Sequence, residues 1–312
     1  MHRNARIFVA GHQGMVGRAV TRELQEQGFE QLILRSRSEL DLRNQAQVLA
    51  MLRDERPDFI VVAAAKVGGI LANNTLRADF ITENLGIALN LIYGAHQADV
   101  SRLLFLGSSC IYPRDCRQPM AEEDLMTGPL EPTNSPYAMA KLAGISLCDA
   151  YRAQHGRRYS SVMPTNLFGP HDNFDLSSSH VLPALLRKAH EAKMSHASTL
   201  EVWGSGVPRR EFLFVDDLAK ACVFLMRHDD PPSLVNVGYG EDVSIRALAE
   251  LVARVVGFEG ALRFDASKPD GMPRKLLNSH RIRELGWRPT VNLEDGIRRT
   301  YDFFLSSVQG ET

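Results

Sequence analysis

The sequence predicts an α/β fold built on a doubly wound parallel sheet, followed by a smaller C-terminal α/β part. Two observations lead to this fold class. Short apolar segments that read as buried strands alternate with amphipathic helical segments through the first half of the chain, an order typical of parallel sheets. The first of these strands, residues 6–10, also runs straight into a glycine-rich turn that opens a helix.

Hydrophobic periodicity sets the boundaries of the expected elements in this first half. An apolar run flanked by polar or glycine residues is assigned to a strand, and an amphipathic stretch to a helix. The buried strands are expected at 6–10, 31–34, 59–65 and 102–107, the helices up to Gly28 and at 44–55 and 77–98, and a loop at 66–75.

The composition excludes several classes of protein. A chain of 312 residues with 44% hydrophobic content can bury a large core, and a net charge of −1 argues against nucleic-acid or membrane partners. No apolar run approaches the roughly 18 residues of a membrane-spanning helix, and the N-terminal segment does not resemble a signal peptide. Neither the histidines nor the cysteines show metal-ligand spacing, so no metal is expected. The cysteines lack a disulfide framework, which fits the cytoplasm; they are Cys110, Cys116, Cys148 and Cys222.

The glycine-rich turn has the spacing G-x-x-G-x-x-G, from Gly11 through Gly14 to Gly17. Glycines allow a tight turn and close approach of the backbone, and a helix N-terminus offers free N–H groups to a pyrophosphate. The expected architecture is therefore of the Rossmann type. After the second strand, Arg37 stands where an arginine suits the 2′-phosphate of NADP, although a solvated basic turn is the alternative. Asp41 and the adjacent Leu42 are expected near the adenine end.

A second motif lies on the helix that should begin at Ser135 and Pro136. Tyr137 and Lys141 are four residues apart, so they share a helix face, and a lysine ammonium beside a phenol should lower the tyrosine pKa. Such a pair can transfer a proton to or from a substrate oxygen. The alternative is two surface residues on an ordinary helix. Ser108, just past the strand at 102–107, is placed to bond a substrate oxygen or, alternatively, its own turn.

Together the glycine turn, Ser108 and Tyr137-x-x-x-Lys141 resemble the extended short-chain dehydrogenase/reductases. Longer stretches are similar to the branch of that family that makes GDP-L-fucose. These stretches are residues 9–17, 63–74 (AAAKVGGILANN), 105–113 (FLGSSCIYP), 163–174 (MPTNLFGPHDNF), 179–181, 210–212 and 267–277 (SKPDGMPRKLL).

The resemblance implies a reaction and roles for particular residues. GDP-4-keto-6-deoxy-D-mannose would be epimerised at C3 and C5 and then reduced at C4 with NADPH. Tyr137, Lys141 and Ser108 would serve the reduction, and Cys110 and His180 the epimerisations. Cys110 lies two residues past Ser108, so on an extended strand end it should point the same way. A homodimer is expected, through the helix at 77–98 and the Tyr137 helix.

The same resemblance implies binding residues for the two ligands. The substrate GDP-sugar would be contacted by Lys188, Trp203, Arg210 and Asp270. The implied NADP-binding residues are Gly11, Gln13, Gly14, Met15, Val16, Gly17, Arg37, Asp41, Leu42, Leu106, Gly107, Ser109, Lys141, Pro164, Asn166, Leu167 and His180.

Two residues depart from the family pattern. Gln13 stands where the family often has arginine, which leaves Arg37 with more of the 2′-phosphate binding, and Asn278 stands where aspartate is usual. The alternatives left open are a colitose-type synthase, a 4-epimerase or a dehydratase of the same fold. The neighbours of Ser108 are Ser109 and Cys110 rather than carboxylic acids, which disfavours a dehydratase. A non-catalytic NADP-binding regulator is disfavoured because the Tyr–Lys pair is intact.

The second half of the chain is expected to form the substrate side. We divide the chain into an NADP-binding domain, 1–165, and a mainly GDP-sugar-binding domain, 166–312, with some of the chain crossing back to the first. Residues 309–312 are expected to fray. The expected elements are strands at 159–163, 200–203 and 234–237 and helices at 181–193, 216–227, 244–256 and 293–305.

Overall fold

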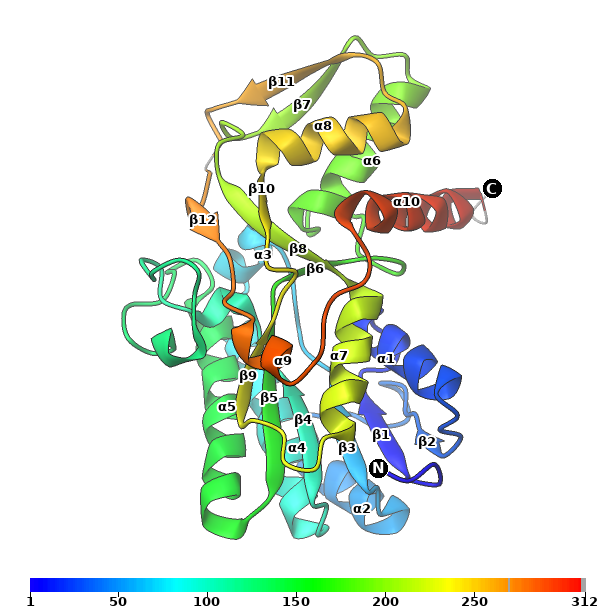
Figure 1. Cartoon of the computed structure of the whole chain (residues 1–312), viewed down its shortest axis with the longest axis vertical. Coiled ribbons are helices and arrows are strands. Elements are labelled where there is room, and N and C mark those ends of the chain that lie inside the picture. Colours follow the sequence, from blue (N-terminus) through cyan, green and yellow to red (C-terminus); the bar gives the residue numbers. More distant parts are fainter. Residues whose placement is uncertain (269, 310–312) are drawn as a thin grey trace.

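A computed structural model of the protein describes residues 1–268 and 270–309, with the side chains of all of these except 70, 71, 308 and 309. Six parallel strands form its main sheet, in the order β2-β1-β3-β4-β5-β9 (Figure 1). The predicted fold class is thereby confirmed. These strands are β1 (Ile7–Ala10), β2 (Leu32–Ile33), β3 (Phe59–Val62), β4 (Arg102–Leu106), β5 (Arg158–Pro164) and β9 (Leu234–Val237).

The order of the strands reverses at β1. That strand pairs with β2 on one side and with β3 on the other, in registers that join Ile7 to Leu32 and to Phe59. The chain therefore leaves β1 in one direction and returns to its other side, which opens a crevice at the carboxyl ends of β1 and β3. This crevice is where a doubly wound sheet binds its ligand.

Helices cover both faces of the main sheet (Figure 1). Alternate strand residues serve the two faces: Ile60 and Val62 join one apolar core, and Phe59 and Val61 the other. The first core is closed by α2 (Gln45–Glu55), α4 (Arg77–Gln97) and α5 (Ser135–His155), and the second by α1 (Met15–Glu26) and α7 (Val215–Arg227).

The helix that carries the Tyr–Lys motif packs unusually close to the sheet. A Cβ placed on Gly144 of α5 would overlap the ring of Phe105 in β4, so the helix lies where only glycine fits. The predicted start is confirmed to within one residue: Ser135 is the first helical residue, with Pro136 next and Asn134 as the N-cap. Gly156 ends the helix in a left-handed conformation, with φ 64°.

A third core lies in the smaller part of the chain, beyond the carboxyl ends of the main sheet (Figure 1). It is built on β8 (Arg209–Phe214), which pairs with β10 (Asp242–Ser244), β12 (Arg274–Lys275) and β6 (Asn166–Phe168). A separate parallel pair joins β7 (Thr199–Trp203) to β11 (Ala261–Asp265). The helices of this part are α6 (Val181–Met194), α8 (Ile245–Val256) and α10 (Leu293–Gln309).

The chain passes between the two parts several times. After β8 it returns to the main sheet with α7 and β9, and Ile282 of α9 (His280–Glu284) also packs in the second core of that sheet. The division at residue 165 stays a proposal, and any division has to accommodate these returning segments.

Some expected boundaries were wrong. The loop at 66–75 contains a helix, α3 (Ile70–Thr75), because Asn73 donates its side-chain amide to the carbonyls of Gly68 and Gly69 and so ties the first turn together. The strand at 59–65 ends at Val62, where the chain turns into the crevice. Strands β6, β8, β10, β11 and β12 were not predicted. Fraying was expected over 309–312, but Gln309 is the last residue of α10, and residues 310–312 lie outside the described residues. No helix in the described part of the chain is long and apolar enough to span a membrane.

Candidate active site

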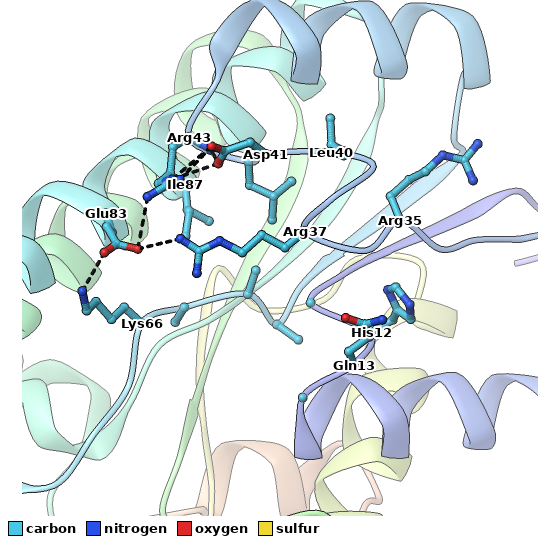
Figure 2. Close-up of a pocket in the computed structure, with 16 residues that line it drawn as sticks. His12, Gln13, Arg35, Arg37, Leu40, Asp41, Arg43, Lys66, Glu83 and Ile87 are labelled. Atoms are coloured by element: carbon cyan, nitrogen blue, oxygen red, sulfur yellow. Dashed lines mark hydrogen bonds and ion pairs between the residues drawn. The ribbon is translucent and has the colours of Figure 1, made fainter. Parts of the chain in front are cut away.

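A cavity of about 240 Å³ lies at the carboxyl ends of β1 and β3 (Figure 2). The glycine turn forms one wall and the segment after β3 another. The helix α4 and the segment after β2 complete it. Its lining includes six of the predicted cofactor residues: Gly11, Gln13, Gly14, Arg37, Asp41 and Leu42.

The glycine turn has no room for side chains at two positions. Gly11 has φ +84°, and a Cβ there would lie 2.7 Å from the backbone of Ala64. A Cβ on Gly17 would overlap the carbonyl oxygen of Gly11. The helix α1 begins directly after the turn, so the first-turn N–H groups of Met15 and its neighbours have no partner within the helix. This geometry suits a pyrophosphate.

A network of charges surrounds the far end of the cavity (Figure 2). Glu83 of α4 pairs with Lys66 at 2.6 Å, with Arg37 at 3.6 Å and with Arg43 at 3.8 Å. Arg43 also binds Asp41 at 2.8 Å, and hydrogen bonding to Arg43 lowers the pKa of Asp41 to about 2. The cations outnumber the carboxylates here, as an anionic ligand requires.

Lys141 is buried beside the carboxyl end of β4, with only 4% of its surface exposed. Its Nζ donates to the carbonyl oxygen of Leu106 at 2.7 Å and lies 5.9 Å from the ring centre of Tyr137. Burial lowers the pKa of Lys141 to about 8. The lysine is therefore held by the end of β4.

The expected lowering of the Tyr137 pKa by Lys141 is wrong for this structure. Burial is the largest cause and raises the pKa of the phenol, the Cys110 thiol adds to the increase, and hydrogen bonding to Ser108 acts the other way. The reason is geometric, since the Lys141 ammonium is bound to a carbonyl rather than to the phenol. Tyr137 is a protonated donor beside Ser108.

Cys110 was expected to continue an extended strand, but it does not. Ser108 is the N-cap of a 3₁₀ turn, Ser109–Ile111, and its Oγ accepts the N–H of Cys110 at 3.2 Å. The turn reverses the chain at the end of β4, and Asn134 donates its side-chain amide to the Cys110 carbonyl oxygen at 3.2 Å. Despite the different backbone, the side chains of Ser108, Cys110 and Tyr137 meet at one place.

The thiol of Cys110 faces positive charge from the second part of the chain. Lys275 of β12 places its Nζ 3.4 Å from the Cys110 Sγ. Burial acts to raise the pKa of Cys110, but Lys275, the Ser108 hydrogen bond and Arg210 together bring it below its usual value. The predicted partner His180 is the N-cap of α6, and burial, followed by the charge of Lys275, lowers its pKa.

The residues predicted to contact the substrate form one further group. Lys188 lies over the Trp203 ring, 4.7 Å from its centre, and 57% of Trp203 is exposed. Asp270 accepts both the N–H and the hydroxyl of Ser205 at 2.7 Å, in the turn after β7. Arg210 of β8 reaches the Asp270 carbonyl at 3.5 Å. Arg210 connects this group to Cys110, because its charge also acts on the Cys110 thiol.

Several other predicted cofactor residues lie at the carboxyl ends of β4 and β5 or just after them, whereas Met15, Val16 and Gly17 form the first turn of α1. Leu106 ends β4 and is followed by Gly107, where a Cβ would meet the Met163 sulfur at 2.5 Å. Ser109 is buried in the turn that follows. Pro164 ends β5, and Asn166 donates to the Glu211 carbonyl at 2.7 Å, with Leu167 beside it on β6.

Lys275, Lys66, Arg43 and Glu83 were missed as site residues. Lys275 stands within the quoted stretch 267–277, but nothing in its spacing connects it to a cysteine so far back in the chain. The other three follow or face strand ends, which is a signal that could have found them. Within the described ranges, no cluster of at least three His, Cys, Asp or Glu side chains could hold a metal ion.

Comparison with known proteins agrees with this geometry. The model of the NAD dependent epimerase/dehydratase family matches residues 7–238. GDP-L-fucose synthase 1 of Arabidopsis thaliana is 56% identical over 306 residues, covering 98% of this chain and 95% of its own. GDP-L-colitose synthase of Yersinia pseudotuberculosis is 37% identical, covering 96% and 98%. A crystal structure of a GDP-L-fucose synthetase from Naegleria fowleri bound to NADP superposes with a TM-score of 0.91 at 27% identity, covering 99% of this chain and 96% of that one. With the glycine turn at the switch point and the Ser–Tyr–Lys group at the end of β4, this chain belongs to the NAD dependent epimerase/dehydratase family.

Proposed function

We propose that this protein is an NADPH-dependent 3,5-epimerase and 4-reductase that converts GDP-4-keto-6-deoxy-D-mannose to GDP-L-fucose. The observation that carries the proposal is that groups suited to ketone reduction and a group suited to proton abstraction from carbon lie together at the end of β4. Ser108 and Tyr137, with Lys141 beneath them, can act on a ketone oxygen, and Cys110 beside them can act on a neighbouring carbon. The 56% identity to a GDP-L-fucose synthase over nearly the whole chain supports the same substrate.

NADP fits the cavity at the β1–β3 switch point. The glycine turn and the start of α1 would hold its pyrophosphate, and Asp41 with Leu42 would lie near the adenine. Arg37 would bind the 2′-phosphate, because Gln13 carries no charge. NADPH, when bound, supplies the hydride that reduces the C4 ketone.

The reduction needs a proton donor at the C4 oxygen. Tyr137 is buried and protonated, so its hydroxyl can donate to the oxygen as negative charge develops there, with Ser108 as a second donor. Lys141 adds a positive charge beneath the strand end and keeps a fixed position through the Leu106 carbonyl. The chain thereby stabilises an oxyanion without water.

The epimerisations use the same oxyanion site. Protons at C3 and C5 are acidic only when the enolate oxygen is stabilised, which Ser108 and Tyr137 provide. One group must remove each proton and another must return it to the opposite face. Cys110 and His180 are proposed for these tasks, and both have pKa values lowered from their usual range.

The GDP part of the substrate would lie along the second part of the chain. Arg210 and Lys188 offer cations to a pyrophosphate, and the exposed face of Trp203 offers a surface for stacking. Asp270 orders the turn beside Trp203 through Ser205. The substrate carbonyl would then reach Tyr137 between the two parts.

We further propose a cytoplasmic homodimer. Leu85 and Leu89 on α4 and Met139 on α5 are exposed, although they are large and apolar. Leu85 and Leu89 are one turn apart, so they form a stripe on one helix face. Such a stripe on two adjacent helices is suited to pairing with a second copy about a two-fold axis.

A direct test is to supply the purified protein with NADPH and two GDP-linked 4-keto sugars. One is GDP-4-keto-6-deoxy-D-mannose, and the other is its 3-deoxy counterpart, which a colitose-forming enzyme would use. The proposal predicts NADPH oxidation with the first, with GDP-L-fucose as the product identified by NMR. A strong preference for the 3-deoxy substrate would overturn it in favour of a colitose-type synthase, and no hydride transfer to either would exclude both.

A further inference from the structure

Lys275 lies directly against the Cys110 thiol. Its Nζ is 3.4 Å from the Cys110 Sγ, although the two residues come from different parts of the molecule. Cys110 belongs to the turn after β4, and Lys275 to β12, which extends the second sheet through its pairing with β8. An ammonium at this distance favours the thiolate over the neutral thiol.

The position of Lys275 is fixed by its backbone rather than by its charge. β12 pairs with β8, so that Lys275 lies opposite Arg210. On the next residue, the Leu276 N–H donates to the side chain of Gln118 at 2.9 Å and the Leu276 carbonyl accepts from Met120 at 2.8 Å. Removal of the ammonium should therefore leave the strand in place.

Three other polar groups face the same thiol. Arg210 of β8 adds a second positive charge, and Ser108 adds a hydrogen bond. Tyr137 of α5 also interacts with it, as a neutral phenol. The two charged groups that act on the Cys110 thiol are thus both positive, with Lys275 in direct contact.

We propose that Lys275 is a positioning residue that holds Cys110 as a thiolate, ready to remove a substrate proton in the epimerisations assigned above to Cys110 and His180. This inference rests on the proposed function for its catalytic meaning. The Cys110 thiolate takes the proton from the carbon beside the C4 ketone, giving a thiol and an enolate. The His180 imidazolium then gives its proton to the opposite face and becomes neutral. Proton exchange with solvent returns both groups to their starting states.

The charge of Lys275 acts on both partners in a recognisable way. A positive charge lowers the pKa of the Cys110 thiol, and it also lowers the pKa of His180, where burial is the larger cause. Removing the charge should therefore raise both pKa values. Loss of packing alone has no reason to move an acid and a base in the same direction.

The test measures how the reactivity of the Cys110 thiol depends on pH in the ligand-free protein. The variants are Lys275→Met, which removes the charge, Lys275→Arg, which keeps it, and Lys193→Met, a matched loss of a lysine on α6. Iodoacetamide alkylation is followed from pH 5.5 to 9.5 by mass spectrometry of the peptides. Cys116 is the internal reference, because burial and then Asp124 raise its pKa to about 11.

We expect Lys275→Met to slow alkylation of Cys110 at pH 7 by about tenfold or more, with the Cys116 rate unchanged. Lys275→Arg should restore most of the rate, and Lys193→Met should match the wild type. In the same variant set, the histidine NMR signal of His180 should titrate at higher pH when the charge is lost. Lys275→Gln serves as a second neutral variant if Lys275→Met does not fold.

An unchanged pH profile of Cys110 in the neutral variants would overturn the inference, even if the enzyme makes GDP-L-fucose. Conversely, the wild-type protein could fail to turn over the GDP-sugar while the Cys110 alkylation profile still moves to higher pH in the neutral variants. That result would establish the charge pair and refute the proposed function. The two failures are therefore distinguishable. With active enzyme, the neutral variants should also lose deuterium uptake at C3 and C5 more than they lose NADPH binding.

Discussion

Replacing Arg37 by glutamine should weaken NADPH binding about tenfold while leaving NADH binding within a factor of two. Four cationic side chains line the cofactor cavity, and three of them already form close ion pairs with carboxylates. Arg35 pairs with Glu55, Arg43 binds Asp41 at 2.8 Å, and Lys66 binds Glu83 at 2.6 Å. Arg37 is 72% exposed and lies 3.6 Å from Glu83, beyond hydrogen-bonding range, so it can turn to a phosphate at little cost.

The size of the effect follows from one charge-assisted contact. Such a hydrogen bond contributes about 1.5–3 kcal/mol in general, and one tenfold change in affinity corresponds to about 1.4 kcal/mol. The exposure of Arg37 places the expected loss at the lower end of that range. NADH has no 2′-phosphate and makes no such contact.

The matched variants act on the carboxylate that competes for these cations. Glu83→Gln should tighten NADPH several-fold, because it removes a negative charge beside the 2′-phosphate and releases Arg37. Asp79→Asn is the control, since Asp79 also pairs with Lys66, at 3.4 Å, but does not line the cavity. Dissociation constants for NADPH and NADH from fluorescence titration, at several salt concentrations, give the ratio directly. Equal losses of both cofactors in Arg37→Gln would refute the assignment of Arg37 to the 2′-phosphate.

Three further predictions concern chemistry, stability and assembly. Tyr137→Phe should lower the rate of NADPH oxidation by about 100-fold or more with NADPH affinity unchanged, and a smaller loss would remove Tyr137 from the proton-donor role. Burial raises the pKa of Asp172 to about 7 from 3.8, so ionisation should destabilise the fold increasingly as the pH rises from about 4 to about 7. Asp172→Asn should therefore raise Tm by about 2–4 °C at pH 8 and hardly at pH 4.5, and an equal gain at both would contradict the burial argument. Leu89→Glu should give the mass of a single chain in light scattering, and an intact dimer would move the interface away from α4.

Local sequence signals predicted the parts of the fold that depend on neighbouring residues. Strand, glycine turn and helix follow one another in the chain, and Gly11 and Gly17 are needed where the turn closes on itself. The Ser135–Pro136 start placed the Tyr137 helix to within one residue. These features depend on local backbone conformation, which residue types such as glycine and proline predict directly.

The missed parts depend on contacts between distant residues. β8 contains Arg209, Arg210 and Glu211, which do not read as a strand, but the Glu211 carboxylate is buried because it accepts the N–H groups of Gly240 and Leu277. The Lys275–Cys110 contact likewise joins two sheets. Helix spacing placed Tyr137 and Lys141 on one face, but it could not show that the ammonium binds the Leu106 carbonyl instead of the phenol.

The most direct test of the account is one reaction in heavy water, with wild-type protein, NADPH and GDP-4-keto-6-deoxy-D-mannose, read by NMR. We predict GDP-L-fucose that carries deuterium at C3 and C5, because the proposed exchange of Cys110 and His180 with solvent would deliver a deuteron to each carbon. In Cys110→Ser, deuterium uptake should fall far more than cofactor binding. A reduced GDP-6-deoxyhexose with unchanged C3 and C5 and no deuterium would contradict the account, since the site would then be a ketoreductase only.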